Sequence, residues 1–192
     1  MRYRRDDVVE RALGLLDVVG LPELTMRRLG ADLGVQPSAL YHHVANKQTL
    51  LALMADELLS RATWPTGGPW PDQVAGVCEA LRETLLGWRD GAELVATVWS
   101  FGLGGAEPYR RLVAALEAGG VDGSGAAGGA GALAPTAART LLHYVYGHAV
   151  DEQTHRQAAD AGAIESEARS DDFGTGLAMV IAGIQVVHGA RV

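Results

Sequence analysis

The amino-acid sequence predicts an all-α protein in two parts. Apolar residues recur at three- and four-residue spacing along most of the 192 residues, which is typical of helices that bury one face. No segment alternates at period two for long, so strands are not favoured. The turn-rich segment 65–71, Pro-Thr-Gly-Gly-Pro-Trp-Pro, separates two groups of helical patterns.

Four helices are expected in the first part. The first carries an apolar stripe and stops at Gly20; the stripe comprises Val8, Val9, Ala12, Leu13, Leu16 and Val19. Thr25 is expected to cap a second helix that ends at Gly34. Pro37 stands in the first turn of a third helix, and Asn46 can cap a fourth.

The second part is also expected to be helical. Helices are predicted over 71–89, 92–100, 106–118, about 136–158 and about 172–188. The Gly- and Ala-rich run 119–131 is of low complexity, and we expect it to be a mobile loop.

Composition limits the possible functions. The net charge is −7, which excludes a protein that coats nucleic acids in general. Cys78 is the single cysteine, so the fold cannot be held by an intrachain disulfide. Residues 1–63 carry eight basic and eight acidic side chains, and the remainder carries eight basic and fifteen acidic ones. No stretch is long and apolar enough to span a membrane, and no catalytic motif is present. We therefore expect a cytoplasmic protein that is not an enzyme.

Residues 26–45 have the pattern of a helix-turn-helix. Gly30 allows close contact between the two helices, and Gly34 tolerates a positive φ at the turn. The second helix can enter a DNA major groove. Arg27 and Arg28 precede it, and Lys47 begins the next helix, where a phosphate can be bound.

Residues 5–60 resemble the DNA-binding domain of the TetR family of bacterial transcriptional repressors. The resemblance rests on Gly20, Leu24-Thr25, Arg27, Leu29, Leu33-Gly34-Val35, Leu40-Tyr41, His43-Val44 and Asn46-Lys47. It implies an all-helical homodimer that binds a palindromic double-stranded DNA operator. It also implies that a small-molecule effector, bound by the C-terminal domain, releases the DNA.

The full prediction is a three-helix helix-turn-helix domain joined by a connecting helix to a C-terminal helical domain for ligand binding and dimerisation. The domain bounds are 1–46, 47–64 and 65–192. The residues expected to contact DNA are Thr25, Arg27, Arg28, Pro37, Ser38, Ala39, Tyr41, His42, His43 and Lys47. Pro37 and Ala39 lack hydrogen-bonding side chains and would read bases only by apolar contact.

An effector pocket is expected among the aromatic and polar side chains of the second part. Its expected residues are Trp88, Glu93, Trp99, Phe101, Tyr109, Tyr144, His148 and Asp151. Segments 88–92, 147–155 and 173–177 resemble the tetracycline-binding members of the family. Val95 and Val98 replace a metal-binding histidine and a threonine of those members, which implies a different ligand. No cofactor and no metal are expected.

The long helix and the last helix are expected to form the dimer interface. A helix-turn-helix protein that reads a palindrome needs two recognition helices about one helical turn of DNA apart. The expected interface residues are Leu141, Tyr144, Val145, Leu177, Val180, Ile181 and Ile184.

Two alternatives stay open. His148 and Glu152, like Asp151 and His155, are four residues apart on one helix, a spacing that can bind a transition metal. The chain would then be a metal-binding helical protein or an enzyme. The other alternative is a DNA-binding regulator without an effector, or an activator.

Overall fold

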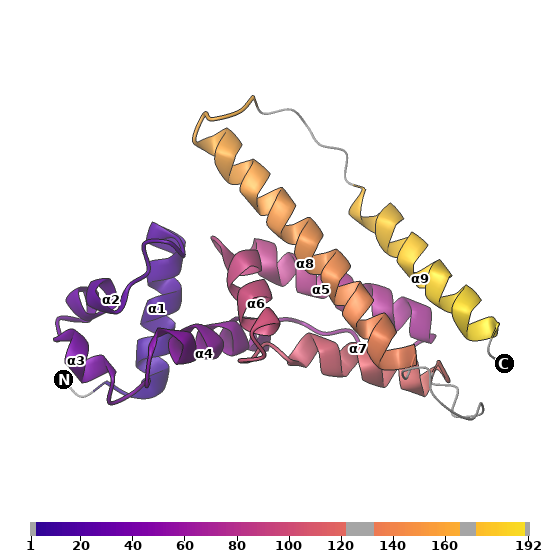
Figure 1. Ribbon diagram of the computed structural model, residues 1–192, viewed down its shortest axis with the longest axis horizontal. Coiled ribbons are helices and arrows are strands. Elements are labelled where there is room, and N and C mark those ends of the chain that lie inside the picture. The colour runs from indigo at the N-terminus through magenta and orange to yellow at the C-terminus, as the bar shows by residue number, and fades with distance from the viewer. Residues whose placement is uncertain (1–2, 122–132, 166–171, 191–192) are drawn as a thin grey trace. The chain divides into compact units, whose positions relative to one another are not determined.

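The computed structural model describes residues 3–121, 133–165 and 172–190, and within these ranges the chain forms helices and no strands (Figure 1). The prediction of an all-α fold is therefore confirmed. The helices are α1 (Arg5–Val19), α2 (Met26–Leu33), α3 (Pro37–Leu40), α4 (Lys47–Ser60), α5 (Trp70–Leu86), α6 (Gly91–Ser100), α7 (Glu107–Ala118), α8 (Leu133–Asp160) and α9 (Phe173–Gly189). Most of the run expected to be a mobile loop, from residue 122 on, lies outside the described residues.

The chain divides into two compact units. The first comprises Met1–Ala62 and Glu83–Ala106, and the second comprises Thr63–Arg82 and Glu107–Val192. Helix α6 therefore groups with α1 to α4, whereas the sequence assigns it to the segment 65–192. The reason is that α4 packs closely against α6, although the two helices are not adjacent in sequence.

The first unit is built around α1 and α4. Helix α1 packs on α2 and α4, and its stripe is buried except for Val19, with Ala12, Leu13 and Leu16 fully inaccessible. Met54 and Leu58 of α4 are equally inaccessible to solvent. Burial of each such side chain contributes about 1.5–3 kcal/mol. This core holds α2 and α3 at the surface of the unit.

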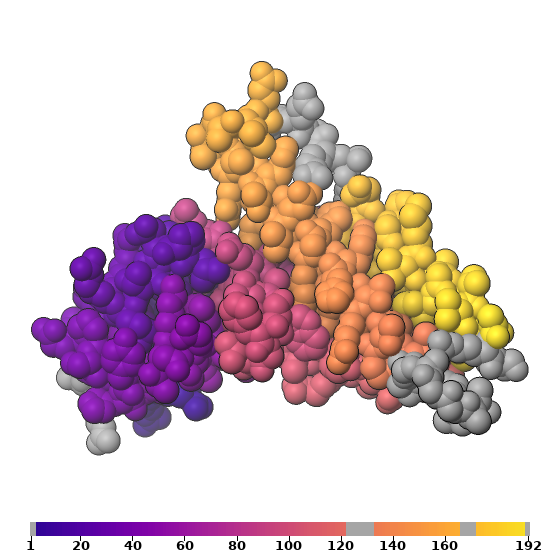
Figure 2. Space-filling view, in the orientation of Figure 1, coloured from indigo at the N-terminus to yellow at the C-terminus, as the bar shows by residue number. Residues whose placement is uncertain are grey.

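In the second unit α8 packs against both α7 and α9. Figure 2 shows the surfaces of α8 (orange) and α9 (yellow) running side by side. Tyr144 of α8 stacks on Phe173 of α9, with ring centroids 5.5 Å apart, and its hydroxyl donates a hydrogen bond to the Phe173 carbonyl oxygen at 2.8 Å. Tyr144 also lies over Gly176, where any side chain would collide with its ring.

Most of the residues expected at a dimer interface lie in the core of the single chain. Leu141 and Val145 are fully inaccessible, and Leu177, Ile181 and Ile184 are buried as well. These side chains pack against other helices of the same chain. A single chain needs such a core whether or not it forms a dimer. The exposed large apolar residues of α9 are Met179, Val186 and Val187, with 69%, 72% and 43% of their surface accessible.

Candidate nucleic-acid interface

Two glycines shape the turn between α2 and α3. Gly34 ends α2 in the left-handed conformation, with φ at 69°, which glycine adopts without strain. At Gly30 an added Cβ atom would lie 3.0 Å from the Val35 carbonyl oxygen and 3.3 Å from the Pro37 nitrogen. Both neighbours are backbone atoms that cannot easily move. The two roles predicted for these glycines are confirmed.

Side-chain caps fix the start of α2 and of α4. The Thr25 hydroxyl accepts a hydrogen bond from the backbone N–H of Arg28 at 3.1 Å. The Asn46 side chain accepts one from the backbone N–H of Thr49 at 2.8 Å. Each cap satisfies an N–H group that the helix itself leaves unpaired. Both were predicted from the sequence.

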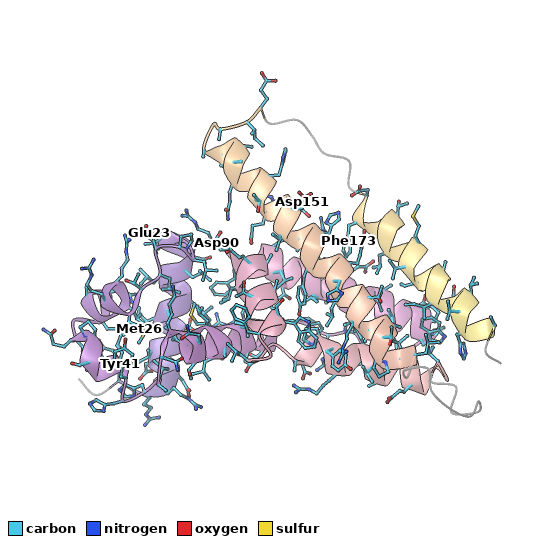
Figure 3. The ribbon with its side chains drawn as sticks, viewed as in Figure 1. Glu23, Met26, Tyr41, Asp90, Asp151 and Phe173 are labelled. Carbon is cyan, nitrogen blue, oxygen red and sulfur yellow. The ribbon has the colours of Figure 1, made fainter. Side chains whose placement is uncertain are left out.

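None of the ten residues predicted to contact DNA is buried. Thr25, Arg27, Arg28, Ser38, Tyr41 and His42 are exposed, and Pro37, Ala39, His43 and Lys47 are partly exposed. Tyr41, labelled in Figure 3, directly follows α3. Half of its surface is accessible.

Two of these ten residues already have intramolecular roles. Thr25 caps α2, and the Arg28 guanidinium forms an ion pair with Glu23 at 3.0 Å. The side chain of Arg27, one residue earlier, has no hydrogen bond or ion pair to another described residue. Arg27 is therefore the better placed of the two arginines to bind a phosphate.

Another face of the same unit is acidic. A cavity of about 470 Å³ lies against α1 and α4 and is lined by Asp6, Asp7, Glu10, Asp56 and Glu57 together with Arg5, Val9 and Leu53. Five carboxylates repel the phosphates of a nucleic acid. The surface formed by α2, α3 and the start of α4 carries Arg27, Arg28 and Lys47 and suits the phosphates of DNA better than this cavity does.

The residues predicted to line an effector pocket are divided between the two units. Trp88, Glu93, Trp99 and Phe101 belong to the first, and Tyr109, Tyr144, His148 and Asp151 belong to the second. Tyr144 and His148 lie close together, with ring centroids 6.0 Å apart. Phe101 is largely exposed, with 68% of its surface accessible.

Sequence reasoning missed a polar cluster that joins α5, α8 and α9. The Arg82 guanidinium pairs with Glu152 at 2.6 Å and stands over the Phe173 ring, 4.9 Å from its centroid. His148 Nε2 lies 3.0 Å from an Asp172 carboxylate oxygen, and its ring meets Phe173 edge-on. The four-residue spacing of His148 and Glu152 was the only local signal. Arg82 lies 70 residues from Glu152, and no periodicity links them.

The Tyr146 hydroxyl is a second polar feature of the second unit, on one of the aromatic residues that the sequence indicated for an effector pocket. The side chain is buried, with 5% of its surface accessible, and its oxygen has no hydrogen-bond partner among the described residues. Burial raises the pKa of this phenol well above its usual range. Buried hydroxyls are normally paired, so this one is an unsatisfied group in the core of the second unit.

The described residues offer no metal centre. No three histidine, cysteine, aspartate or glutamate side chains among them are placed to hold an ion. His148 instead lies between Asp172 and Glu152, 3.7 Å from the latter. No described helix is long and apolar enough to cross a membrane.

These features define an all-helical protein with a helix-turn-helix unit. Residues 64–163 match the family model described as the tetracyclin repressor-like C-terminal domain. The class D tetracycline repressor of Escherichia coli is 37% identical over 97 residues, or 48% of this chain and 44% of that protein. The chain thus aligns with less than half the length of this curated relative.

Solved structures match almost the whole chain. BioQ of Mycobacterium smegmatis is 37% identical, with a TM-score of 0.85 over 96% of this chain and 99% of BioQ. BioQ bound to its double-stranded DNA operator gives a TM-score of 0.79, at 37% identity over 95% of this chain and 98% of that one. ActR of Streptomyces coelicolor in complex with actinorhodin is 28% identical, with a TM-score of 0.78 over 98% of this chain and 100% of ActR. The chain belongs to the TetR family of transcriptional regulators.

Proposed function

We propose that the protein is a transcriptional repressor that binds an operator as a homodimer and is released by a small-molecule effector. The observation that carries this proposal is the helix-turn-helix itself. Capped α2, the left-handed turn at Gly34 and the exposed surface of α3 form the docking element that such proteins insert into the major groove. BioQ, which shares this fold, is solved on its DNA operator.

Phosphate contacts would position the protein on the duplex. Lys47 begins α4, where its ammonium group and the backbone N–H groups of the first turn can hold one phosphate together. Arg27 and the Tyr41 hydroxyl would bind others on either side of α3. The acidic groups that line the cavity against α1 and α4 disfavour DNA binding at that place.

Dimerisation would place two copies of α3 on successive major grooves, about 34–36 Å apart. The exposed side chains of Met179, Val186 and Val187 on α9 are the apolar surface available for a second copy. Such a surface, rather than the buried stripe of Leu177, Ile181 and Ile184, would meet the partner. A repressor of this kind works in the cytoplasm, where its operator is.

Effector binding would act by linkage. DNA favours one arrangement of the chain and the effector favours another, and a coupling of about 1–3 kcal/mol is typical of such systems. ActR, a relative of the same fold, is solved with the small molecule actinorhodin. In this chain Tyr144, His148 and the unsatisfied Tyr146 hydroxyl are the candidate polar contacts of the second unit.

The test is a gel-shift assay with purified protein and the duplex DNA upstream of its own gene, repeated with a panel of small molecules. A gel shift that one compound abolishes would support both operator binding and release of the DNA by a small-molecule effector. A shift that no compound abolishes would retain DNA binding and favour an effector-independent regulator. If neither that DNA nor a randomised duplex library is bound at moderate salt, the repressor proposal fails.

A further inference from the structure

His148 of α8 is in contact with the start of α9. Its Nε2 atom lies 3.0 Å from an Asp172 carboxylate oxygen, and the centroid of its ring lies 5.1 Å from that of Phe173 (Figure 3 labels Phe173). Asp172 is the N-cap residue of α9, a position where aspartate is favoured because its carboxylate can bond to the first turn. In this chain the Asp172 side chain makes no such bond. Its carboxylate bonds to His148 instead and joins α9 to α8.

The other ring nitrogen of His148 is buried without a hydrogen bond. Nδ1 is almost inaccessible to solvent and has no hydrogen-bond partner among the described residues. A Glu152 carboxylate oxygen lies 3.7 Å from it. A neutral imidazole ring carries one N–H group, so it can donate to only one of the two carboxylates and directs a lone pair at the other. A protonated ring carries two N–H groups and can direct one to each carboxylate.

Ionisable groups from three helices lie near the ring. Those recorded in contact with His148 or with its two carboxylate partners are Asp172, Glu152, Arg82, Arg156 and the Tyr144 phenol. Arg82 and Arg156 both pair with Glu152, at 2.6 and 2.5 Å, so they offset the attraction between that carboxylate and a proton on the ring. No ionisable side chain of α7, which also packs on α8, is recorded as a partner of the ring among the described residues. Asp172 therefore supplies the main attraction for the proton.

We propose that His148 forms a pH-sensitive link between α8 and α9, which is stronger when the imidazole ring is protonated. Histidine is the side chain that ordinarily changes its charge between about pH 5 and pH 8, where aspartate and glutamate stay ionised. A folded state that holds this proton more tightly than the unfolded chain is stabilised as the pH falls, and it loses that stabilisation as the pH rises. The link lies within one chain, so this inference does not depend on the proposed function.

The experiment compares the full chain with three variants by urea denaturation between about pH 5.5 and pH 8, at one fixed protein concentration. His148→Gln replaces the ring by a polar side chain whose charge does not change with pH. Asp172→Asn removes the carboxylate partner, and its side chain is 73% exposed, so this variant serves if His148→Gln does not fold. His143→Gln is the matched control, because His143 is exposed on the same helix and its ring has no recorded hydrogen bond or ion pair to a described residue.

For each variant the folding equilibrium constant of the wild type is divided by that of the variant. With His148→Gln this ratio should rise by about 10-fold from pH 8 to pH 5.5, as expected for one hydrogen bond to a charged group. It should rise in the same direction with Asp172→Asn and stay constant with His143→Gln. A ratio for Asp172→Asn or His148→Gln that is constant or falls on acidification would overturn the inference, and so would an equal rise with His143→Gln. None of these outcomes involves DNA, so the proposed function is tested separately.

Discussion

The Asp90 carboxylate accepts a hydrogen bond from the backbone N–H of Leu21, with 2.6 Å between oxygen and nitrogen. Leu21 follows α1 and Asp90 precedes α6, so the contact ties the end of one helix to the start of another within the first unit (Figure 3 labels Asp90). Asp90 is buried and has a positive φ of 55°. A side chain at Gly20 would come within 2.8 Å of the same carboxylate. Gly20 therefore has a packing role besides ending α1.

We predict that Asp90→Ala lowers the free energy of unfolding by about 2–4 kcal/mol, since it leaves the Leu21 N–H unpaired and places alanine in the left-handed region. Asp90→Asn should cost only about 1 kcal/mol, because asparagine tolerates that conformation and retains an acceptor oxygen. Urea denaturation at one fixed protein concentration measures both values. Equal losses in the two variants would show that this hydrogen bond contributes little.

Two neighbouring tyrosines of α8 should respond in opposite directions to loss of the hydroxyl. Tyr144→Phe removes the hydrogen bond to the Phe173 carbonyl oxygen and should destabilise the protein by about 1 kcal/mol. Tyr146→Phe removes a buried hydroxyl without a partner, so stability should be unchanged or higher by up to about 1 kcal/mol. Chemical denaturation of both variants tests the pair. A clear destabilisation by Tyr146→Phe would show that its hydroxyl is bonded after all.

Two glycines of α9 give another matched pair. A Cβ atom at Gly176 would collide with the Tyr144 ring, whereas nothing lies within 4 Å of one at Gly174. Gly176→Ala should therefore cost about 1–3 kcal/mol through overpacking between α8 and α9. Gly174→Ala should raise stability by about 0.5–1 kcal/mol, because alanine favours the helix. Thermal unfolding at equal protein concentration compares them, and similar midpoints for both variants would contradict this packing.

Local chemistry in the sequence was enough to predict the helix-turn-helix. Thr25, Asn46, Gly34 and Pro37 act through their own backbone neighbourhood, so each role follows from residue type and position. The bounds of the later helices were predicted to within a few residues from the spacing of their apolar side chains.

Contacts between distant parts of the chain could not be predicted in this way. An apolar stripe such as Leu177, Ile181 and Ile184 shows that one face of a helix is buried, but not whether its own chain or a second copy covers it. The pair of Arg82 and Glu152 and the grouping of α6 with the N-terminal helices depend on packing between segments far apart in sequence. The spacing of apolar residues along the sequence does not indicate such contacts.

Cys78 should be inert in the folded protein. It is fully inaccessible to solvent, and burial raises the pKa of its thiol to about 12. Since the thiolate is the reactive form, almost none is present at pH 8. We expect no reaction with Ellman's reagent at that pH in the native protein, and reaction of one thiol per chain in guanidinium chloride. Rapid reaction of the native protein would contradict this burial.

Tyr41 provides the sharpest mutational test of the α3 surface. Half of the side chain is exposed and the structure records no hydrogen bond from its hydroxyl to a described residue, so neither Tyr41→Phe nor Tyr41→Ala should disturb the fold. If the hydroxyl donates to a phosphate, Tyr41→Phe should weaken operator binding by about 10-fold or more, as expected for a hydrogen bond to a charged group.

Tyr41→Ala should weaken operator binding at least as much as Tyr41→Phe, without change in the dimer population measured by analytical ultracentrifugation. A gel-shift titration on the selected operator gives the affinities. Arg28→Ala is the matched comparison on the same surface, because Arg28 already pairs with Glu23 and should lose less affinity. Wild-type affinity in Tyr41→Ala would show that this end of α3 does not meet the DNA backbone.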